Sequence, residues 1–194
     1  MSSPSAAYAL VEDKRHRQFI YRFLILAGFN RNKITVEVSP SGHGSGKQWV
    51  CNNFALQVET CRRRNAKAAT CLFVMVDADQ LAVTKCVGDL DSALVSANQP
   101  RLDPARDPVA KLIPKWSIET WIHYLSSDEA TRPSVKEDRP YKNSKSEEQW
   151  SELIPEASKT LYMWTKNQSG RPNNLPDSLQ HGLGEIPRAL SVGR

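Results

Sequence analysis

The feature that most constrains the fold is an unbroken apolar run, Cys71–Val76. A run of this kind is typical of a strand buried on both faces, and such strands belong to parallel sheets covered by helices. Shorter apolar or β-branched runs predict three more strands, at 7–11, 34–38 and 109–113. Amphipathic segments alternate with the strands and predict helices at 14–27, 48–64, 81–97 and 117–125. The alternation predicts an α/β fold, with a four-stranded, mostly parallel sheet flanked by helices.

The chain changes character after residue 125. Residues 126–148 are dominated by Ser, Asp, Glu, Lys, Arg and Pro, which favours a polar loop or linker. Residues 149–166 regain a helical pattern, in which Pro155 is expected to break the helix or begin a new one. We therefore expect an α/β core over 1–125, a polar loop or linker over 126–148, and a helical C-terminal extension over 149–194.

Composition excludes several classes of protein. The longest apolar stretch lies within 19–29 and is interrupted by Arg22, so it is too short to span a membrane. The N-terminus lacks the basic and apolar regions of a secretory signal. The four cysteines form no CxxC pair and are too sparse for a disulfide scaffold. These features predict a cytoplasmic protein with reduced thiols, and its net charge of +5 is compatible with binding nucleic acid.

Acidic residues follow two of the predicted strands. Glu12 comes after the first strand, and Asp77 and Asp79 come after the third. The carboxyl ends of parallel strands meet at one edge, so the three carboxylates are expected to converge there. Mg²⁺, or Mn²⁺ in its place, binds such oxygen ligands and keeps waters for substrate phosphates. The alternative is that Asp77 and Asp79 only cap the next helix.

These two motifs, Leu10-Val11-Glu12-Asp13 and Val74-Met75-Val76-Asp77-Ala78-Asp79, resemble those of the Toprim domain of topoisomerases, primases and related nucleases. The resemblance covers about residues 6–125 and is nearest to small stand-alone Toprim-like proteins and nucleases of the overcoming-lysogenisation-defect type. It implies a Toprim-like Rossmannoid core, Glu12 as general acid/base or metal ligand, and Asp77 and Asp79 as Mg²⁺ ligands. It also implies a setting in bacterial antiviral defence with an ATPase partner. The chain departs from the pattern in having Asp13 where a Gly often follows the Glu.

A second set of candidates follows the fourth strand. Lys115 is placed to bind a scissile phosphate, and Glu119 to complete a metal shell. The alternative is that Ser117 caps a helix and that Glu119 only favours its first turn. Lys142, in the polar segment, is a further candidate for a phosphate contact, although a solvated lysine is the better explanation.

The glycine-rich loop 39–47 lacks two of the four residues that define a P-loop, because Ser41 and Gln48 stand at those positions. The backbone amides of this loop and the N-terminus of the following helix still suit an anion, so Ser45 and Lys47 are candidate substrate contacts. The alternative is that the loop is only a flexible glycine turn. His16 is a candidate because it is near Glu12, although a histidine there is commonly on the surface.

Basic runs at 14–17 and 62–64 either follow a nucleic-acid backbone or are solvated helix ends.

Three functions are compatible with these observations. The first is a Mg²⁺-dependent nuclease or nuclease subunit that cleaves DNA in preference to RNA. An ATPase partner and a homo-oligomeric state are compatible with this function. The second is a non-catalytic Toprim-like subunit that joins a defence complex through residues 127–194. The third is a response-regulator-like phospho-acceptor, in which Asp77 accepts the phosphoryl group near Lys115.

Overall fold

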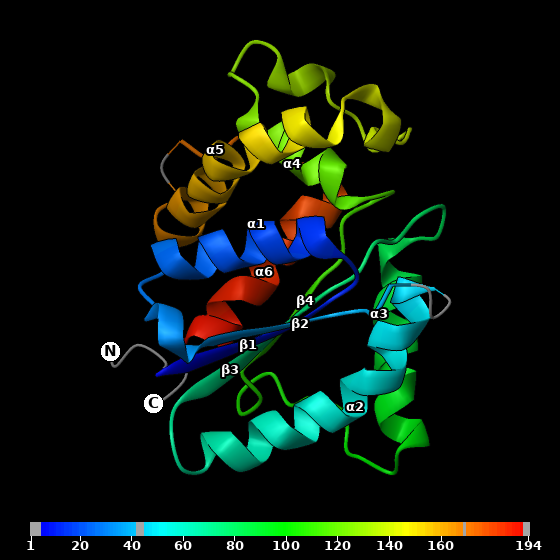
Figure 1. The fold of residues 1–194 in the computed structure, drawn as a ribbon, viewed down its shortest axis with the longest axis vertical. Helices are drawn as coiled ribbons and strands as arrows, with labels where there is room; N and C mark the ends of the chain where they lie inside the picture. The colour runs from blue at the N-terminus through cyan, green and yellow to red at the C-terminus, as the bar shows by residue number, and fades with distance from the viewer. Residues whose placement is uncertain (1–4, 42–44, 169, 192–194) are drawn as a thin grey trace.

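The sheet of this protein has four strands, all parallel, in the order β2-β1-β3-β4 within the part of the chain that the structure describes (Figure 1). The structure is a computed structural model, and it describes residues 5–41, 45–168 and 170–191. The strands are β1 (Ala6–Val11), β2 (Ile34–Val38), β3 (Thr70–Met75) and β4 (Val109–Leu112). The helices are α1 (Lys14–Leu26), α2 (Gly46–Asn65), α3 (Val83–Ser96), α4 (Ile118–Ser126), α5 (Glu147–Lys166) and α6 (Asp177–Leu190). Short 3₁₀ helices occupy Arg31–Lys33 (η1), Arg132–Ser134 (η2) and Lys142–Ser144 (η3).

This architecture confirms the predicted α/β fold, because every strand and helix expected within 1–125 is present, with ends shifted by at most two residues. The apolar run that begins at Cys71 lies in β3 except for its last residue, Val76, and all six residues of β3 are buried. β3 is central, with β1 on one side and β4 on the other, and both neighbours are parallel to it. A strand that is covered on both faces and paired on both edges favours apolar side chains, which explains the unbroken apolar sequence from Cys71 onward.

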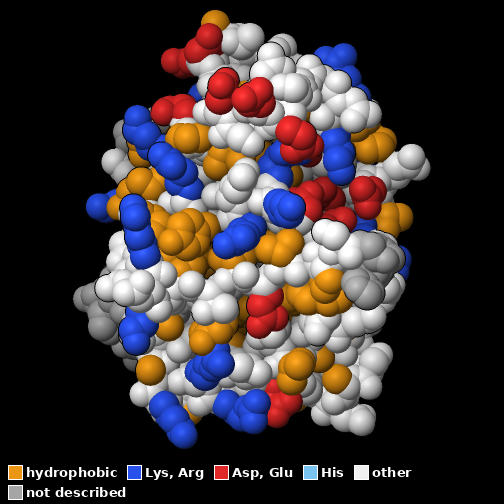
Figure 2. Space-filling view, viewed as in Figure 1, with side chains coloured by type: hydrophobic (Ala, Val, Ile, Leu, Met, Phe, Trp, Pro, Cys, Tyr) orange, Lys and Arg blue, Asp and Glu red, His pale blue; other side chains and the backbone are white. Residues whose placement is uncertain are grey.

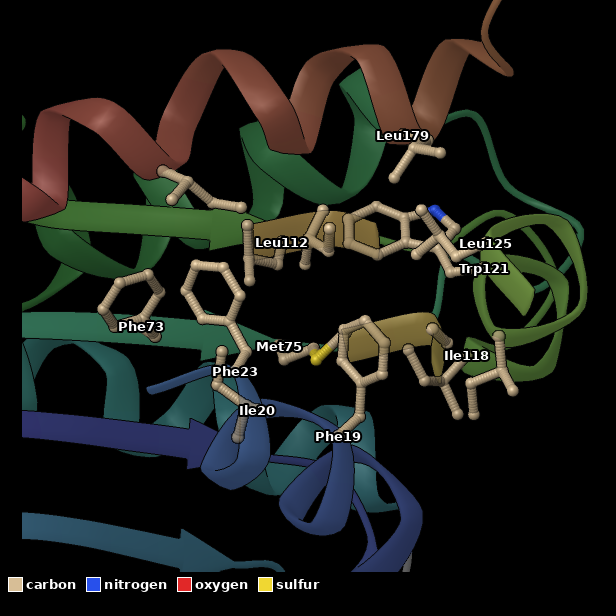
Figure 3. Close-up of a cluster of buried hydrophobic side chains, with 14 of the residues drawn as sticks. Phe19, Ile20, Phe23, Phe73, Met75, Leu112, Ile118, Trp121, Leu125 and Leu179 are labelled. Carbon is tan, nitrogen blue, oxygen red and sulfur yellow. The ribbon is translucent and has the colours of Figure 1, made fainter. Parts of the chain in front are cut away.

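Helices cover the two faces of the sheet unequally. One face carries α2 and α3, which enclose a core with Leu10, Leu72 and Val74. The other face carries α1 and α6, with α4 and α5 packed over them (Figure 1). On this second face, aromatic and aliphatic side chains from the sheet, α1, α4 and α6 meet in one cluster, in which Trp121 lies opposite Phe19 (Figure 3).

The C-terminal helices belong to this same cluster. Helix α5 packs against α1 and α4, and α6 lies along β4. Trp150, Ile154 and Leu161 of α5 are buried, as are Leu183 and Ile186 of α6. The two helices therefore complete the packing of the α/β core.

The expectation that Pro155 breaks the helix is wrong, since α5 runs without interruption from Glu147 to Lys166. A capping box at Ser146 and Gln149 fixes the start of α5, and its apolar face is held against α1 and α4. This tertiary packing offsets the backbone hydrogen bond that proline cannot donate. In the preceding segment, Val135 and Tyr141 are buried against the same core.

The β4 edge of the sheet is covered by side chains of α6. On β4, Glu185 accepts a hydrogen bond from the Lys111 backbone N–H at 3.0 Å. The Arg188 guanidinium donates from Nε and Nη2 to the Val109 carbonyl at 3.1 and 2.8 Å. Side chains of α6 thus occupy the backbone groups of this edge strand.

No helix in the described residues is long and apolar enough to cross a membrane.

Candidate active site at the carboxyl edge of the sheet

The ends of β1 and β3 bring two carboxyl residues together. Val11 pairs with Met75 in the parallel ladder, and the Glu12 N–H donates to the Met75 carbonyl at 3.2 Å. The Glu12 side chain then turns toward β3, where Oε2 accepts a hydrogen bond from the Asp77 backbone N–H at 3.1 Å. The structure therefore places Glu12 and Asp77 side by side, as the strand order predicts.

His16 lies beneath this pair and is fully buried. Its Nε2 is 2.9 Å from Oδ1 of Asp77, and its Nδ1 is 2.8 Å from Oδ1 of Asp13. The Asp13 carboxylate also accepts from the backbone N–H groups of Arg15 and His16 and so caps α1. The sequence predicts that His16 is a substrate contact or a surface residue, whereas the structure buries it with both ring nitrogens bonded to carboxylates.

Burial and charge shift the pKa values of this cluster in opposite directions. Burial opposes a charge on His16, but Asp77 and Asp13 outweigh it and raise the pKa of the imidazole to about 10. The ring is therefore an imidazolium at neutral pH and donates to both carboxylates. The pKa of Asp77 is raised because burial outweighs the attraction of His16. The pKa of Glu12 is also raised, first by burial and then by the charge of Asp77.

Asp79 and Lys47 lie at the rim of this cluster. The Lys47 ammonium donates to the Asp77 carbonyl at 2.9 Å and to the Ala78 carbonyl at 3.2 Å, and it is 3.4 Å from Oδ2 of Asp79. The Asp79 side chain is 62% exposed, so it faces solvent beside Glu12 and Asp77. Lys47, a predicted substrate contact in the first turn of α2, thus bonds to the backbone that follows β3.

Helix α2 begins against Glu12. Ser45 is its N-cap, with a hydroxyl that accepts from the Gln48 N–H at 3.4 Å. A Cβ on Gly46 would lie 2.6 Å from Cγ of Glu12 and 3.0 Å from its backbone oxygen. Only glycine allows this approach, which brings the positive end of the helix dipole to the carboxylate. Gly42, His43 and Gly44 of the rejected P-loop motif lie outside the described residues.

The backbone is unusual where β3 and β4 end. Asp79 and Trp116 form an antiparallel bridge, and both have left-handed φ angles, of 53° and 65°. Asp tolerates this conformation, but a bulky residue such as Trp rarely adopts it. The Trp116 indole N–H donates to the Glu137 carbonyl at 3.0 Å, which holds the ring in place. Strained residues of this kind cluster at functional sites, and sequence reasoning missed this pair.

Glu119 has a different environment from that expected of a metal ligand. It is buried, 1% exposed, and forms an ion pair with Arg15, whose other nitrogen pairs with Glu147 at the start of α5. No hydrogen bond or ion pair among the described residues joins Glu119 to Glu12, Asp77 or Asp79. Nearby, the Ser117 hydroxyl is buried without a described partner, so Ser117 stands at the N-cap of α4 but makes no capping hydrogen bond.

The remaining predicted residues lie at the edge of the site or away from it. Lys115 donates from Nζ to the Leu81 carbonyl at 2.7 Å, and its ammonium lies 5.0 Å from the centre of the Trp116 ring. No hydrogen bond or ion pair in the described chain joins Lys115 to Asp77. Lys142 is exposed in η3, and its carbonyl accepts from the Trp150 indole at 3.2 Å.

The described residues hold no group of three or more His, Cys, Asp or Glu side chains arranged to bind one metal ion. The predicted set of ligands is therefore not assembled as one shell. Mg²⁺ commonly takes only one or two protein carboxylates and keeps its waters. Glu12 and Asp77 fit that requirement, because Oε1 of Glu12 and Oδ2 of Asp77 make no hydrogen bond with a described residue.

No family model, no curated protein and no solved structure matches this chain. The arguments about its function therefore rest on the residues and on their geometry.

Proposed function

We propose that this protein is a Mg²⁺-dependent nuclease, or the nuclease subunit of a complex, that hydrolyses phosphodiester bonds. The observation that carries the proposal is the pairing of Glu12 with Asp77 at the carboxyl edge, where Asp77 is buried, Glu12 is half-buried, and partial burial and then the charge of Asp77 raise the pKa of Glu12. Buried like charges are costly, and such pairs persist chiefly where a function uses them. A divalent cation between them would relieve the repulsion.

The residues of the site suit distinct tasks in phosphodiester hydrolysis. Asp77 and Glu12 would hold the cation, with Asp79 at the solvent side, and Glu12 would accept a proton from the attacking water. Bound Mg²⁺ would supply the Lewis acidity that activates water and stabilises the leaving oxygen. Lys47 and Lys115, on either side of this edge, would offset the charge of the phosphate.

The left-handed pair Asp79 and Trp116 adds independent support. The bridge between them fixes the segment that carries Asp79 relative to the segment that carries Lys115. Rigid placement of a carboxylate and an ammonium matters where both must contact one phosphate. The ATPase partner and the setting in antiviral defence follow from the resemblance to Toprim-type nucleases and are part of the proposal.

The test is metal-dependent cleavage of labelled DNA and RNA by the purified chain. We expect Glu12→Gln to lower the cleavage rate by about 10²–10⁴-fold, the usual worth of a general acid or base. Asp77→Asn should remove both cleavage and binding of Mn²⁺ in a calorimetric titration. Asp89→Asn is the matched control, because this carboxylate lies on α3 and pairs only with Lys85 among the described residues. Cleavage that survives both changes at the site would refute the assignment.

A non-catalytic subunit is the second candidate, and one observation favours it. The His16 imidazolium and the Lys47 ammonium already offset part of the negative charge at this edge. A site neutralised in this way could keep the fold for binding a partner without holding a cation. The titration separates the two functions, because a subunit of this kind would bind neither Mg²⁺ nor Mn²⁺ while remaining folded.

A further inference from the structure

The net positive charge of this chain is concentrated in one segment. Residues 14–36 contain six of the 26 Lys and Arg residues and no Asp or Glu. The rest of the chain therefore has 20 Lys and Arg residues against 21 Asp and Glu residues. The formal charge of +5 is thus a property of α1, η1 and the start of β2 rather than of the whole surface.

One of these six cationic side chains is buried and the other five are exposed. Arg15 points inward to Glu119, together with His16. The other five are exposed and form what we call the α1 stripe: Lys14, Arg17, Arg22, Arg31 and Lys33. None of the five has an ion pair with a carboxylate in the described part of the chain. Exposed cations that lack an internal partner are available to an external anion.

The second basic run, 62–64, is different because each of its guanidinium groups already contacts a partner within the chain. The Arg62 guanidinium makes two hydrogen bonds to Asp107, at 2.9 and 2.8 Å. Arg63 is 4.0 Å from Glu59, and the Arg64 guanidinium lies 4.1 Å from the centre of the Tyr8 ring. Of the two basic runs, therefore, the α1 stripe is the one left open to a partner.

The stripe leads to the candidate active site. Helix α1 starts directly after Asp13, at the carboxyl edge, and extends about 20 Å away from it over 13 residues. Figure 2 shows Lys and Arg side chains over α1, with acidic side chains at the end where the helix begins. On one side the stripe is bordered by α5, which carries exposed carboxylates such as Glu148 and Glu152. On the other side it is bordered by β2.

We infer that the α1 stripe is the surface that binds the nucleic-acid backbone and leads it to the Glu12–Asp77 edge. This inference rests on the proposed nuclease function and specifies where that function takes hold of its substrate. A polyanion gains affinity by releasing counterions to Lys and Arg, so a row of unpaired cations is the required chemistry. The acidic border at α5 repels phosphates and confines the path to α1 and the side toward β2.

The test measures binding without cleavage, as fluorescence anisotropy of labelled single-stranded and duplex DNA with the wild-type chain in EDTA. The variant is Arg17→Gln/Arg22→Gln, which removes two exposed charges. We expect about tenfold weaker binding at 0.1 M salt. The slope of log K against log salt should fall by roughly 1.4–1.8, the loss of two phosphate contacts. The matched control is Lys67→Gln/Arg101→Gln, two exposed cations off the stripe, which should bind like the wild type.

Three results would overturn the inference: no binding of either DNA by the wild-type chain at low salt, equal weakening in the control, or an unchanged variant. Binding to phosphatidylserine vesicles but not to DNA would assign the stripe to a membrane surface and would also overturn it. The proposed function is tested separately, because Asp77→Asn should keep full DNA affinity while losing cleavage in Mg²⁺. A wild-type chain that binds along the stripe but never cleaves would refute the nuclease function and leave the surface standing.

Discussion

Arg15 and His16 are neighbours on α1, and both are buried cations at the carboxyl edge. They differ in how much negative charge from carboxylates surrounds them. Arg15 pairs with Glu119 and Glu147 and joins α1 to α4 and α5. His16 pairs with Asp13 and Asp77, and the Glu12 carboxylate lies against the same aspartate. The first cluster links helices to helices, whereas the second places its carboxylates where two strands end.

The difference shows how a buried charge can serve packing in one place and chemistry in another. In the Arg15 cluster one carboxylate is buried and the other, Glu147, is 88% exposed, so a single guanidinium balances the buried charge. In the His16 cluster the carboxylates of Asp13, Asp77 and Glu12 outnumber the one imidazolium. Burial first, and then the charge of Asp77, raises the pKa of Glu12, and the surplus negative charge favours a further cation.

The largest effect should come from breaking the Arg15 cluster. Arg15→Met leaves Glu119 buried and uncompensated, and we expect it to lower the free energy of unfolding by about 3–5 kcal/mol. The double variant Arg15→Met/Glu119→Met replaces the pair with apolar groups and should recover most of this loss. Urea denaturation measures both. If the double variant is as unstable as the single one, the guanidinium stabilises the fold through contacts other than this ion pair.

A smaller effect, with a distinctive pH dependence, should come from His16. His16→Gln removes charge-assisted hydrogen bonds to Asp13 and Asp77 and should cost about 1.5–3 kcal/mol at pH 7. Because folding raises the pKa of His16 to about 10, its contribution is complete below about pH 6.5 and is lost as the pH rises toward 10. Thermal melting temperatures across pH 6.5–10 should fall for the wild type and change less for the variant. Parallel pH profiles would mean that His16 is neutral in the folded state.

The smallest effect on stability should come from a substitution at Gly46, where the start of α2 packs against Glu12. Gly46→Ala forces the Glu12 side chain to move, which costs about 1 kcal/mol, the low end for overpacking, since alanine also favours the helix. The displacement should nevertheless weaken binding of Mn²⁺ in calorimetry. Gly88→Ala is the control, because its Cβ would meet nothing within 4 Å. Full metal binding by Gly46→Ala would show that the position of Glu12 is not critical.

The fold could be predicted because its signals are local. The burial of β3 on both faces is visible in its own six residues, and the alternation of strands and helices implies a parallel sheet. The same reasoning brought Glu12 and Asp77 to one edge, since strand ends meet by topology. Asp13 also follows the local rule for a helix cap.

What the sequence did not reveal depends on distant partners. Arg15 and His16 look like part of a solvated basic run, and their burial depends on partners far along the chain. These partners are Glu119 and Glu147 for Arg15, and Asp77, 61 positions away, for His16. Glu119 looks like a candidate metal ligand in the sequence because its ion pair with Arg15, 104 positions earlier, is not visible there. Pro155 was expected to end a helix because α1 and α4, which hold that helix, lie far away in the chain.

The contact of α6 with β4 has a consequence for synthesis of the chain. The four strands of the described sheet have been made by residue 112, but the buried residues of α6 and the side chains of Glu185 and Arg188 are made more than 60 residues later. Until they emerge from the ribosome, β4 has an open edge, and α1 covers its face of the sheet without α6 beside it. We therefore expect the sheet to be incompletely packed until α6 has been made, and the nascent chain to be most exposed to aggregation and to chaperones in that interval.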